Sequence, residues 1–231
     1  IIATVLLTSV ASIVMLQPEM LGSYARSALA SLLSFANLVF FFESGYWDSA
    51  AEQKPLLHLW SLGVEEQFYL IWPLILIGLT QLRYSLYLPG VLLFFSVSLF
   101  AFIYYTPVDS AATFYLIPFR AWQFLLGVMA LEIWRHSRLN LFSNQVLRSI
   151  GLALCCMGVY LLADPSAFPG WQALIPSLGA ALVLIACSNN DPSPVLSNVP
   201  ASWLGRVSYS MYLVHWPPIA LYHAYTLSEL T

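Results

Sequence analysis

Charged residues are scarce in this sequence. Asp, Glu, Lys and Arg together make up 8% of the chain, whereas about 25% is typical of a soluble domain. Hydrophobic residues make up 60%, and the mean hydropathy is +0.77. No run of like charge is present that could bind nucleic acid or serve as a charged tail. These features exclude an ordinary soluble domain and predict an integral, multi-pass membrane protein that does not bind nucleic acid.

Cysteine is also rare. The three cysteines, Cys155, Cys156 and Cys187, lie inside apolar runs and lack the spacing of metal ligands. We interpret them as lipid-facing or core residues. We therefore expect no metal site and no resident cofactor. Internal repeats are absent as well, so the sequence gives no support to an inverted-repeat transporter.

The first residues, Ile1 and Ile2, already belong to an apolar run that lasts to Leu16. A signal peptide would have a charged start and a small-residue cleavage site, and neither is present. We interpret the sequence as a piece that begins partway through a helix.

Apolar segments recur along the whole chain. A helix needs about 20 apolar residues to cross the hydrocarbon core of a bilayer. Candidates lie near residues 1–16, 24–42, 59–80, 87–105, 112–134, 146–163, 171–187 and 203–226. Turn-forming residues separate them, for example Thr106-Pro107 and Asp164-Pro165. We predict an all-α, polytopic transmembrane bundle with about eight membrane segments. Segment 24–42 either crosses or is re-entrant, because Asn37 interrupts it.

The charges of the connections suggest an orientation. Basic residues fall on alternate connections: Arg83, then Arg135, Arg138 and Arg148, then Arg206. The intervening connections hold Glu43, Asp48, Glu52 and Lys54, then Asp109, then Asp164. Basic loops usually stay in the cytoplasm. This rule predicts that the 43–57 loop is external, and a re-entrant 24–42 would reverse the side assigned to everything before it.

The stretch from His58 to Pro73 gathers polar groups at the start of an apolar segment. At the bilayer centre an ionisable side chain costs about 2.5–3.5 kcal/mol, so such groups usually face a polar cavity or a partner. A helix would align His58, Ser61, Glu65, Tyr69 and Trp72 on one stripe, Trp60 and Gln67 on another, and Glu66 in a third direction. We expect neighbouring helices to enclose this segment around a hydrated site. A purely structural hydrogen-bond hub is the alternative.

A second block runs from Pro118 to Gly127. Its Arg120 is the only basic residue well inside a predicted span, and its forked donors suit a carboxylate or a phosphate. The anion could be Glu65 or Glu66 in a structural pair, or the phosphates of a bound donor. Gly127 is expected to permit close helix contact.

A third block runs from Leu204 to Pro218. Ser208, Tyr212 and His215 share one helical face, and Pro217-Pro218 should leave backbone carbonyls one turn earlier without their donors. Freed carbonyls beside an imidazole would make a ligand wall. For Tyr209 and Trp216 an aromatic belt at the membrane interface is the alternative.

These three blocks, in this order, resemble the integral-membrane acyltransferase family 3, the O-acetyltransferase type that modifies bacterial surface polysaccharides and related glycans. The similarity rests on Pro55 to Tyr69, on Phe119-Arg120-Ala121-Trp122 with Gly127, and on Gly205 to Pro217, and it extends over essentially the whole chain. It implies one transmembrane acyltransferase domain over residues 1–231 in a bacterial cytoplasmic (inner) membrane. The resemblance implies a bundle of about ten helices in the complete protein. It also implies an enzyme that passes an acyl group from a donor such as acetyl-CoA to a sugar hydroxyl.

Two features of the family are missing here. Its first helix carries an Arg followed by a His regarded as the catalytic base, and an arginine-rich loop follows its second helix. Neither occurs in this sequence. The resemblance therefore implies that two helices lie upstream of Ile1 and that this piece alone is inactive. The family also tends to have an acidic residue where Gln123 stands.

The resemblance and the polar pattern together give the candidate site. Glu65, Glu66 and His58 are the candidate catalytic residues, with the glutamates orienting the upstream base or the acceptor. Donor or substrate binding is assigned to Arg120, Trp60, Ser61, Gln67, Tyr69, Trp122, Ser208, Tyr209, Ser210, Tyr212 and His215. The expected partners are an acyl-CoA donor, membrane lipid and a glycan or lipid-linked saccharide; no signal indicates the oligomeric state. A transporter and a non-catalytic assembly subunit remain alternatives.

Overall fold

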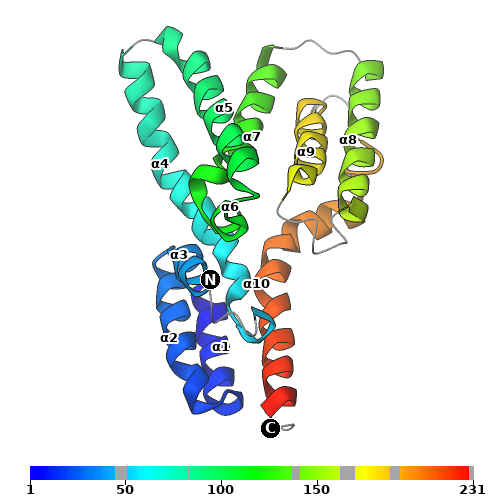
Figure 1. Cartoon of the computed structure of the whole chain (residues 1–231). Helices are drawn as coiled ribbons and strands as arrows, with labels where there is room; N and C mark the ends of the chain where they lie inside the picture. Colours follow the sequence, from blue (N-terminus) through cyan, green and yellow to red (C-terminus); the bar gives the residue numbers. More distant parts are fainter. Residues whose placement is uncertain (45–50, 83, 137–140, 162–169, 188–192, 229–231) are drawn as a thin grey trace. The chain divides into compact units, whose positions relative to one another are not determined.

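The computed structural model describes residues 1–44, 51–82, 84–136, 141–161, 170–187 and 193–228. This described part contains helices and turns but no strand, which confirms the all-α prediction. The chain divides into two compact units, one formed by Ile1–Ile71 with Trp203–Thr231 and the other by Trp72–Ser202. Figure 1 shows the order of the helices along the chain. The expectation of one domain over the whole sequence stays a prediction.

The first unit begins with α1 (Ile2–Met15) and α2 (Pro18–Leu32). Pro18 occupies the first turn of α2, where its missing N–H costs no hydrogen bond. The hydroxyl of Tyr24 reaches across to α1, lying 3.3 Å from the carbonyl oxygen of Val5 and 2.9 Å from Ser9 Oγ. These contacts hold the two helices side by side.

The chain turns sharply between α2 and α3 (Ala36–Glu43). Ser34 has a φ of 64°, in the left-handed region that a residue with a side chain rarely adopts. The amide of Phe35 then donates to the carbonyl of Ala30 over 2.8 Å. The predicted segment 24–42 is thus divided between α2 and α3 by a left-handed residue, and whether it crosses or is re-entrant stays a prediction.

The first unit is completed by the short 3₁₀ turns η1 (Ala51–Gln53) and η2 (Leu57–Leu59), by the first part of α4 (Trp60–Leu82) and by most of α10 (Val199–Ser228). Leu56, Leu59, Val64 and Phe40 are buried and form apolar contacts around the start of α4. The helix α10 continues through Pro217 and Pro218.

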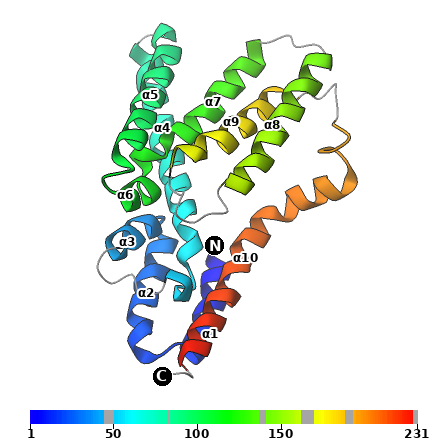
Figure 2. The ribbon, with the colours of Figure 1, turned by 45° about the vertical axis from the view of Figure 1, so that its right-hand side comes forward.

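The second unit contains the rest of α4, then η3 (Tyr84–Leu86), α5 (Tyr87–Tyr105), α6 (Ser110–Tyr115), η4 (Ile117–Phe119), α7 (Ala121–His136), α8 (Leu141–Leu161), η6 (Trp171–Ala173) and α9 (Leu174–Ile185). Figure 2 shows α9 running beside α8. These two helices approach closely because both carry glycine at the contact: a Cβ on Gly151 would lie 2.6 Å from the carbonyl oxygen of Gly179.

Three helical segments within the described ranges are long and apolar enough to cross a bilayer: Leu57–Gln81, Tyr87–Tyr105 and Phe142–Leu161. Ile2–Met15 and Trp171–Ile185 are shorter apolar helices. The predicted span 112–134 is divided among α6, η4 and α7, where Asp109 caps α6 by accepting from the amide of Ala112 over 2.9 Å. The finding is a helical membrane protein, and the expected count of about eight spans is not confirmed. Asp48, Arg83, Arg138 and Asp164 with Pro165, which entered the reasoning on loops, lie outside the described residues.

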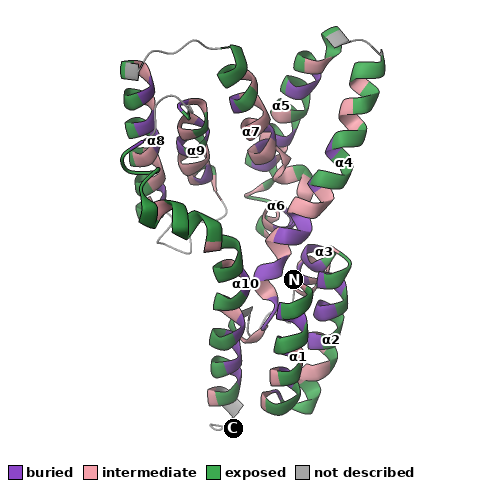
Figure 3. Cartoon of the chain, turned by 180° about the vertical axis from the view of Figure 1, so that it is seen from behind, coloured by how far each residue is buried: buried purple, intermediate pink, exposed green. Residues whose placement is uncertain are grey.

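Apolar side chains cover much of the outer surface of individual helices. Leu6, Leu7, Val10, Ile13 and Val14 on α1 are each more than 60% exposed. Figure 3 shows such exposed surface in green along α1 and α10. Cys156 and Cys187 are exposed and Cys155 is half-buried. Exposed apolar surface of this extent is typical of helices that contact lipid.

Candidate functional site

His58 lies at the centre of a cluster in the first unit, in η2 immediately before α4. Its side chain is 6% exposed. The Nε2 atom lies 3.2 Å from the carbonyl oxygen of Leu213 in α10. The centroid of its ring lies 5.5 Å from that of Tyr212 and 5.6 Å from that of His215. Residues far apart in the sequence are thus brought together around one imidazole.

The hydroxyl of Tyr212 forms hydrogen bonds to two residues of this cluster. The hydroxyl donates to the backbone carbonyl of His58 and also bonds to Ser61 Oγ. His215 Nδ1 lies 2.7 Å from the carbonyl oxygen of Tyr212. Because a carbonyl oxygen can only accept, the ring nitrogens of His58 and His215 in these two contacts are the donors.

Glu66 and Gln67 are directed toward the turn between α2 and α3. Ser34 Oγ donates to Glu66 Oε2. Gln67 Nε2 lies 2.9 Å from both the carbonyl oxygen of Ser34 and Asn37 Oδ1. Asn37 is fully buried, and its Nδ2 lies 3.4 Å from Gln67 Oε1. The left-handed backbone of Ser34 is therefore held by bonds to both its side chain and its carbonyl.

Gly63 explains why these groups can meet. A Cβ at this position would lie 2.9 Å from Asn37 Oδ1 and 3.3 Å from the carbonyl oxygen of Ser34. Any larger residue would push the start of α3 away from α4. The glycine in the sequence Trp60-Ser61-Leu62-Gly63 is thus a requirement for the Glu66–Ser34 contact.

Glu65 points elsewhere. Its Oε1 accepts a hydrogen bond of 2.6 Å from the hydroxyl of Tyr69, one helical turn later, as the predicted stripe requires. Tyr69 itself is 60% exposed. Trp60 is half-buried at the start of α4, and Trp72 is buried within the second unit. The two adjacent glutamates therefore have different partners and different surroundings.

Only some of the predicted site residues from the block Leu204 to Pro218, which lies in α10, contact the cluster around His58. Ser208, Tyr209 and Ser210 are exposed, and Ser208 Oγ donates to the carbonyl of Gly205 in its own helix over 2.8 Å. Trp216 Nε1 donates to the carbonyl of Lys54 over 2.9 Å, which fastens the segment before His58 to α10. Tyr212 and His215 are the predicted residues that lie against His58.

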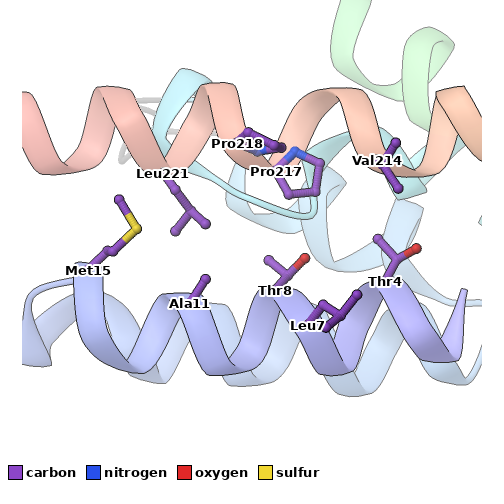
Figure 4. Close-up of a pocket in the computed structure, with 9 residues that line it drawn as sticks. All are labelled: Thr4, Leu7, Thr8, Ala11, Met15, Val214, Pro217, Pro218 and Leu221. Carbon is purple, nitrogen blue, oxygen red and sulfur yellow. The ribbon is translucent and has the colours of Figure 1, made fainter.

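A groove of about 440 Å³ lies between α1 and α10, within the first unit. Figure 4 shows Thr4, Leu7, Thr8, Ala11 and Met15 of α1 opposite Val214, Pro217, Pro218 and Leu221 of α10. The lining is apolar except for the two threonine hydroxyls. Val214 directly follows Leu213, whose carbonyl His58 binds, so the groove and the histidine cluster share one turn of α10. A groove of this composition can hold a hydrocarbon chain.

Arg120 belongs to the second unit, between η4 and α7. Its contacts include a hydrogen bond of 3.1 Å from Nη1 to the carbonyl of Phe114 and one of 3.2 Å from Nε to Gln123 Oε1. The guanidinium carbon also lies 5.6 Å from the centroid of the Phe114 ring. The predicted role of Arg120 toward an anion stays a prediction.

Trp122, which we expected to contact substrate, is 1% exposed and packs in an apolar cluster with Phe102 and Ala173. Its backbone N–H donates to Ser98 Oγ over 2.9 Å. In this structure its side chain is part of the core of the second unit.

Ser34 and Asn37 belong to the network but were not among the predicted site residues. Asn37 gave a signal, because it is a polar residue inside an apolar run. Ser34 gave none, since nothing in the sequence marks a serine with a left-handed backbone. No group of three His, Cys, Asp or Glu side chains within the described ranges is arranged to hold a metal ion.

Comparison with known proteins connects this geometry to a family. A family model described as an acyltransferase domain matches residues 2–229. YrhL of Bacillus subtilis is 30% identical over 236 residues, which cover 93% of this chain and 36% of that protein. The peptidoglycan O-acetyltransferase OatA of Listeria monocytogenes is 29% identical over 229 residues, which cover 90% and 36% of the two chains.

The O-acetyltransferase OatA of Staphylococcus aureus is 25% identical over 225 residues, 90% of this chain and 37% of that protein. The chain thus spans about a third of the length of the curated relatives it matches. No solved structure matches it. On the family match, which covers nearly every residue, the chain belongs to the integral-membrane acyltransferase family 3 that its motifs resembled.

Proposed function

We propose that this chain carries the reaction centre of a membrane-bound acyltransferase. The enzyme moves an acyl group, acetyl in the simplest case, from an acyl-CoA-type donor to a hydroxyl of a cell-surface glycan or a lipid-linked saccharide. The membrane is the bacterial cytoplasmic membrane. The observation that carries the proposal is the cluster of His58, Ser61, Tyr212 and His215, which belongs to the same unit as the Glu66–Ser34 contact.

The chemistry of acyl transfer explains why such a cluster is useful. The acceptor oxygen forms a bond to the acyl carbon, and the carbon–sulfur bond of the donor thioester breaks. The hydroxyl proton passes to a base and then to the leaving thiolate, so the products are an ester and a thiol. A base and a set of donors for the developing oxyanion each lower the barrier.

The residues divide these tasks as follows. Glu66, fixed by Ser34, orients the acceptor or the base that the family resemblance implies upstream. Ser61 and Tyr212, whose hydroxyls bond to one another, line the pocket next to the backbone carbonyl of His58. Arg120 holds the phosphates of the donor, for which a forked, permanently charged side chain is suited.

The acceptor is proposed from the relatives. One is named a peptidoglycan O-acetyltransferase and another an O-acetyltransferase. A lipid-linked saccharide would add a hydrocarbon chain to the hydroxyl, and the groove between α1 and α10 is apolar and adjacent to the histidine cluster. This supports a membrane-anchored acceptor.

The test uses the natural full-length protein in membrane vesicles, with radiolabelled acetyl-CoA and cell-wall glycan as acceptor. We expect alkali-labile label on the glycan, and we expect Glu66→Gln and Arg120→Ala to remove it while leaving the amount of protein in the membrane unchanged. Flux of label across the vesicle without a covalent product would instead support a transporter. Full transfer by Glu65→Gln, Glu66→Gln and Arg120→Ala would refute the assignment of the site.

A further inference from the structure

The hydrogen bond from His58 to α10 exists because of a proline. In a regular helix the carbonyl of Leu213 would accept from the N–H of the residue four positions later. That residue is Pro217, which has no N–H. The carbonyl of Leu213 is left without its helical donor, and the Nε2 of the buried His58 lies 3.2 Å from it.

This contact determines where the proton sits on the imidazole. A carbonyl oxygen accepts but cannot donate, so Nε2 must carry the hydrogen. In a neutral ring the other nitrogen, Nδ1, then carries the lone pair. In the described part of the chain Nδ1 is enclosed and has no hydrogen-bond partner, although the side chain is 94% buried. A buried acceptor of this kind is normally satisfied, so it indicates a partner that binds there.

We propose that Pro217 is a positioning residue: by freeing the carbonyl of Leu213 it holds His58 as the Nε2–H tautomer, so that Nδ1 accepts the proton of the acceptor hydroxyl. This inference rests on the proposed acyl transfer, and it assigns the proton of the acceptor hydroxyl to His58 in this chain in place of the upstream base that the family resemblance implies. As the proton arrives at Nδ1, the ring becomes a cation whose Nε2–H still donates to Leu213. The proton then passes from Nδ1 to the sulfur of the departing thiolate, which leaves as the thiol.

The surroundings of the ring fit this role. The rings of Tyr212 and His215 lie edge-on to His58, at 5.5 and 5.6 Å between centroids. His215 donates through Nδ1 to the carbonyl of Tyr212, so its own tautomer is fixed in the opposite sense. The two histidines therefore present unlike nitrogens as acceptors, Nδ1 of the buried ring and Nε2 of the exposed one.

Two substitutions of His58 separate a chemical role from a structural one. In His58→Gln the amide nitrogen lies where Nε2 was and can still donate to Leu213, but no basic nitrogen remains. We expect the full-length protein to insert and to keep its thermal midpoint, and its kcat to fall by a hundredfold or more, as for loss of a general base. Transfer by His58→Gln at the wild-type rate would overturn the role of Nδ1 and leave the proposed acyltransferase standing.

The proline is tested with a matched pair. In Pro217→Ala the restored N–H competes with His58 for the carbonyl of Leu213. In Pro218→Ala the restored N–H reaches Val214 instead, and both prolines line the same groove, so the second variant controls for changes in the groove. Both variants alter the groove, but only Pro217→Ala restores a donor to Leu213, so we expect kcat to fall about three- to tenfold further in Pro217→Ala than in Pro218→Ala, the effect of one hydrogen bond. Equal effects of the two variants would overturn the inference.

A spectroscopic measurement reads the tautomer without any activity. The full-length protein is labelled with ¹⁵N-histidine in lipid nanodiscs, and the His58 signals are assigned by their loss in His58→Gln. We expect a protonated Nε2 and an unprotonated Nδ1 in the wild type and in Pro218→Ala, and a mixture in Pro217→Ala. A wild-type ring protonated at Nδ1 would overturn the inference. Because this result does not depend on transfer, it stands apart from a failure of the proposed function.

Discussion

The two units of the chain differ in their most prominent contacts between helices. In the first unit, hydrogen bonds join α4 to α3 through Gln67 and to α10 through Ser61, and His58 in η2 also bonds to α10. In the second unit, α8 and α9 meet through glycines, with a Cβ on Gly151 only 2.6 Å from the opposing backbone. Polar contacts inside a membrane protein gain little net stability, about 0.6 kcal/mol on average. The second unit also has hydrogen bonds between helices, such as the one of 2.9 Å from the hydroxyl of Tyr87 to Glu132 Oε1. What distinguishes the first unit is that its polar contacts converge on a buried imidazole, which supports the chemistry proposed for it.

The largest effect is expected at Glu66. Glu66→Gln keeps the shape of the side chain but removes the charge that Ser34 Oγ binds, and we expect transfer to fall by a hundredfold or more in the full-length protein. Vesicle assays with labelled acetyl-CoA measure this. Glu52→Gln, at an exposed position of the same unit, should change nothing. A comparable loss in both variants would show that the assay responds to net charge rather than to this contact.

Gly151→Ala should affect stability alone. The new methyl group would meet the backbone of Gly179, which cannot move aside as a flexible side chain can, so we expect a loss of about 2–3 kcal/mol. Thermal unfolding in detergent measures it. The control is Gly127→Ala in the same unit, because the close helix contact expected at Gly127 is not found: no neighbour lies within 4 Å of its Cβ position. If Gly151→Ala were as stable as the wild type, the steric account of the second unit would be wrong.

Gly63→Ala should affect both stability and activity. Its Cβ would lie 2.9 Å from Asn37 Oδ1, and the amide can shift by a few tenths of an ångström, so a loss of about 1–2 kcal/mol is expected. Displacement of the turn before α3 should also weaken the contact between Ser34 and Glu66 and lower kcat. Gly78→Ala, later in the same helix with no neighbour within 4 Å, should retain full activity. If Gly63→Ala lost stability but kept the wild-type kcat, the turn at Ser34 would have no role in the transfer reaction.

The smallest effect is expected at Tyr69. Tyr69→Phe removes a hydrogen bond of 2.6 Å to Glu65 at a position that is 60% exposed, so we expect less than about 0.5 kcal/mol in stability and less than a threefold change in rate. The same vesicle and unfolding assays apply. A loss as large as that of Glu66→Gln would mean that Glu65, and not Glu66, is the more important carboxylate.

The sequence predicted those parts of the site that depend on local spacing. The stripe that contains Glu65 and Tyr69 follows from helical geometry, and their contact has the predicted register of one turn. The prediction that Pro217 frees a carbonyl beside an imidazole was also sound, but the partner is His58 rather than His215. Helix periodicity contains no information about which distant side chain donates a hydrogen bond to a carbonyl that has lost its helical donor.

The parts that were missed depend on tertiary contacts. The break at Ser34 arises because Gln67 and Glu66 stabilise a backbone conformation that serine does not prefer, and no local propensity reports such compensation. The indole of Trp122, which the resemblance and the polar pattern assigned to donor or substrate binding, packs against Phe102 in this structure. Neighbours in sequence can point into a core or toward a site, and packing decides between them.

Position 34 has to satisfy two requirements that few amino acids meet together. Glycine would adopt the left-handed backbone at no steric cost but has no hydroxyl to give to Glu66; threonine has the hydroxyl, but its branched Cβ resists that conformation. The orientation of the Glu66 carboxylate thus depends on the backbone conformation of the turn between α2 and α3. Moving that carboxylate by design would require a redesign of the turn as well.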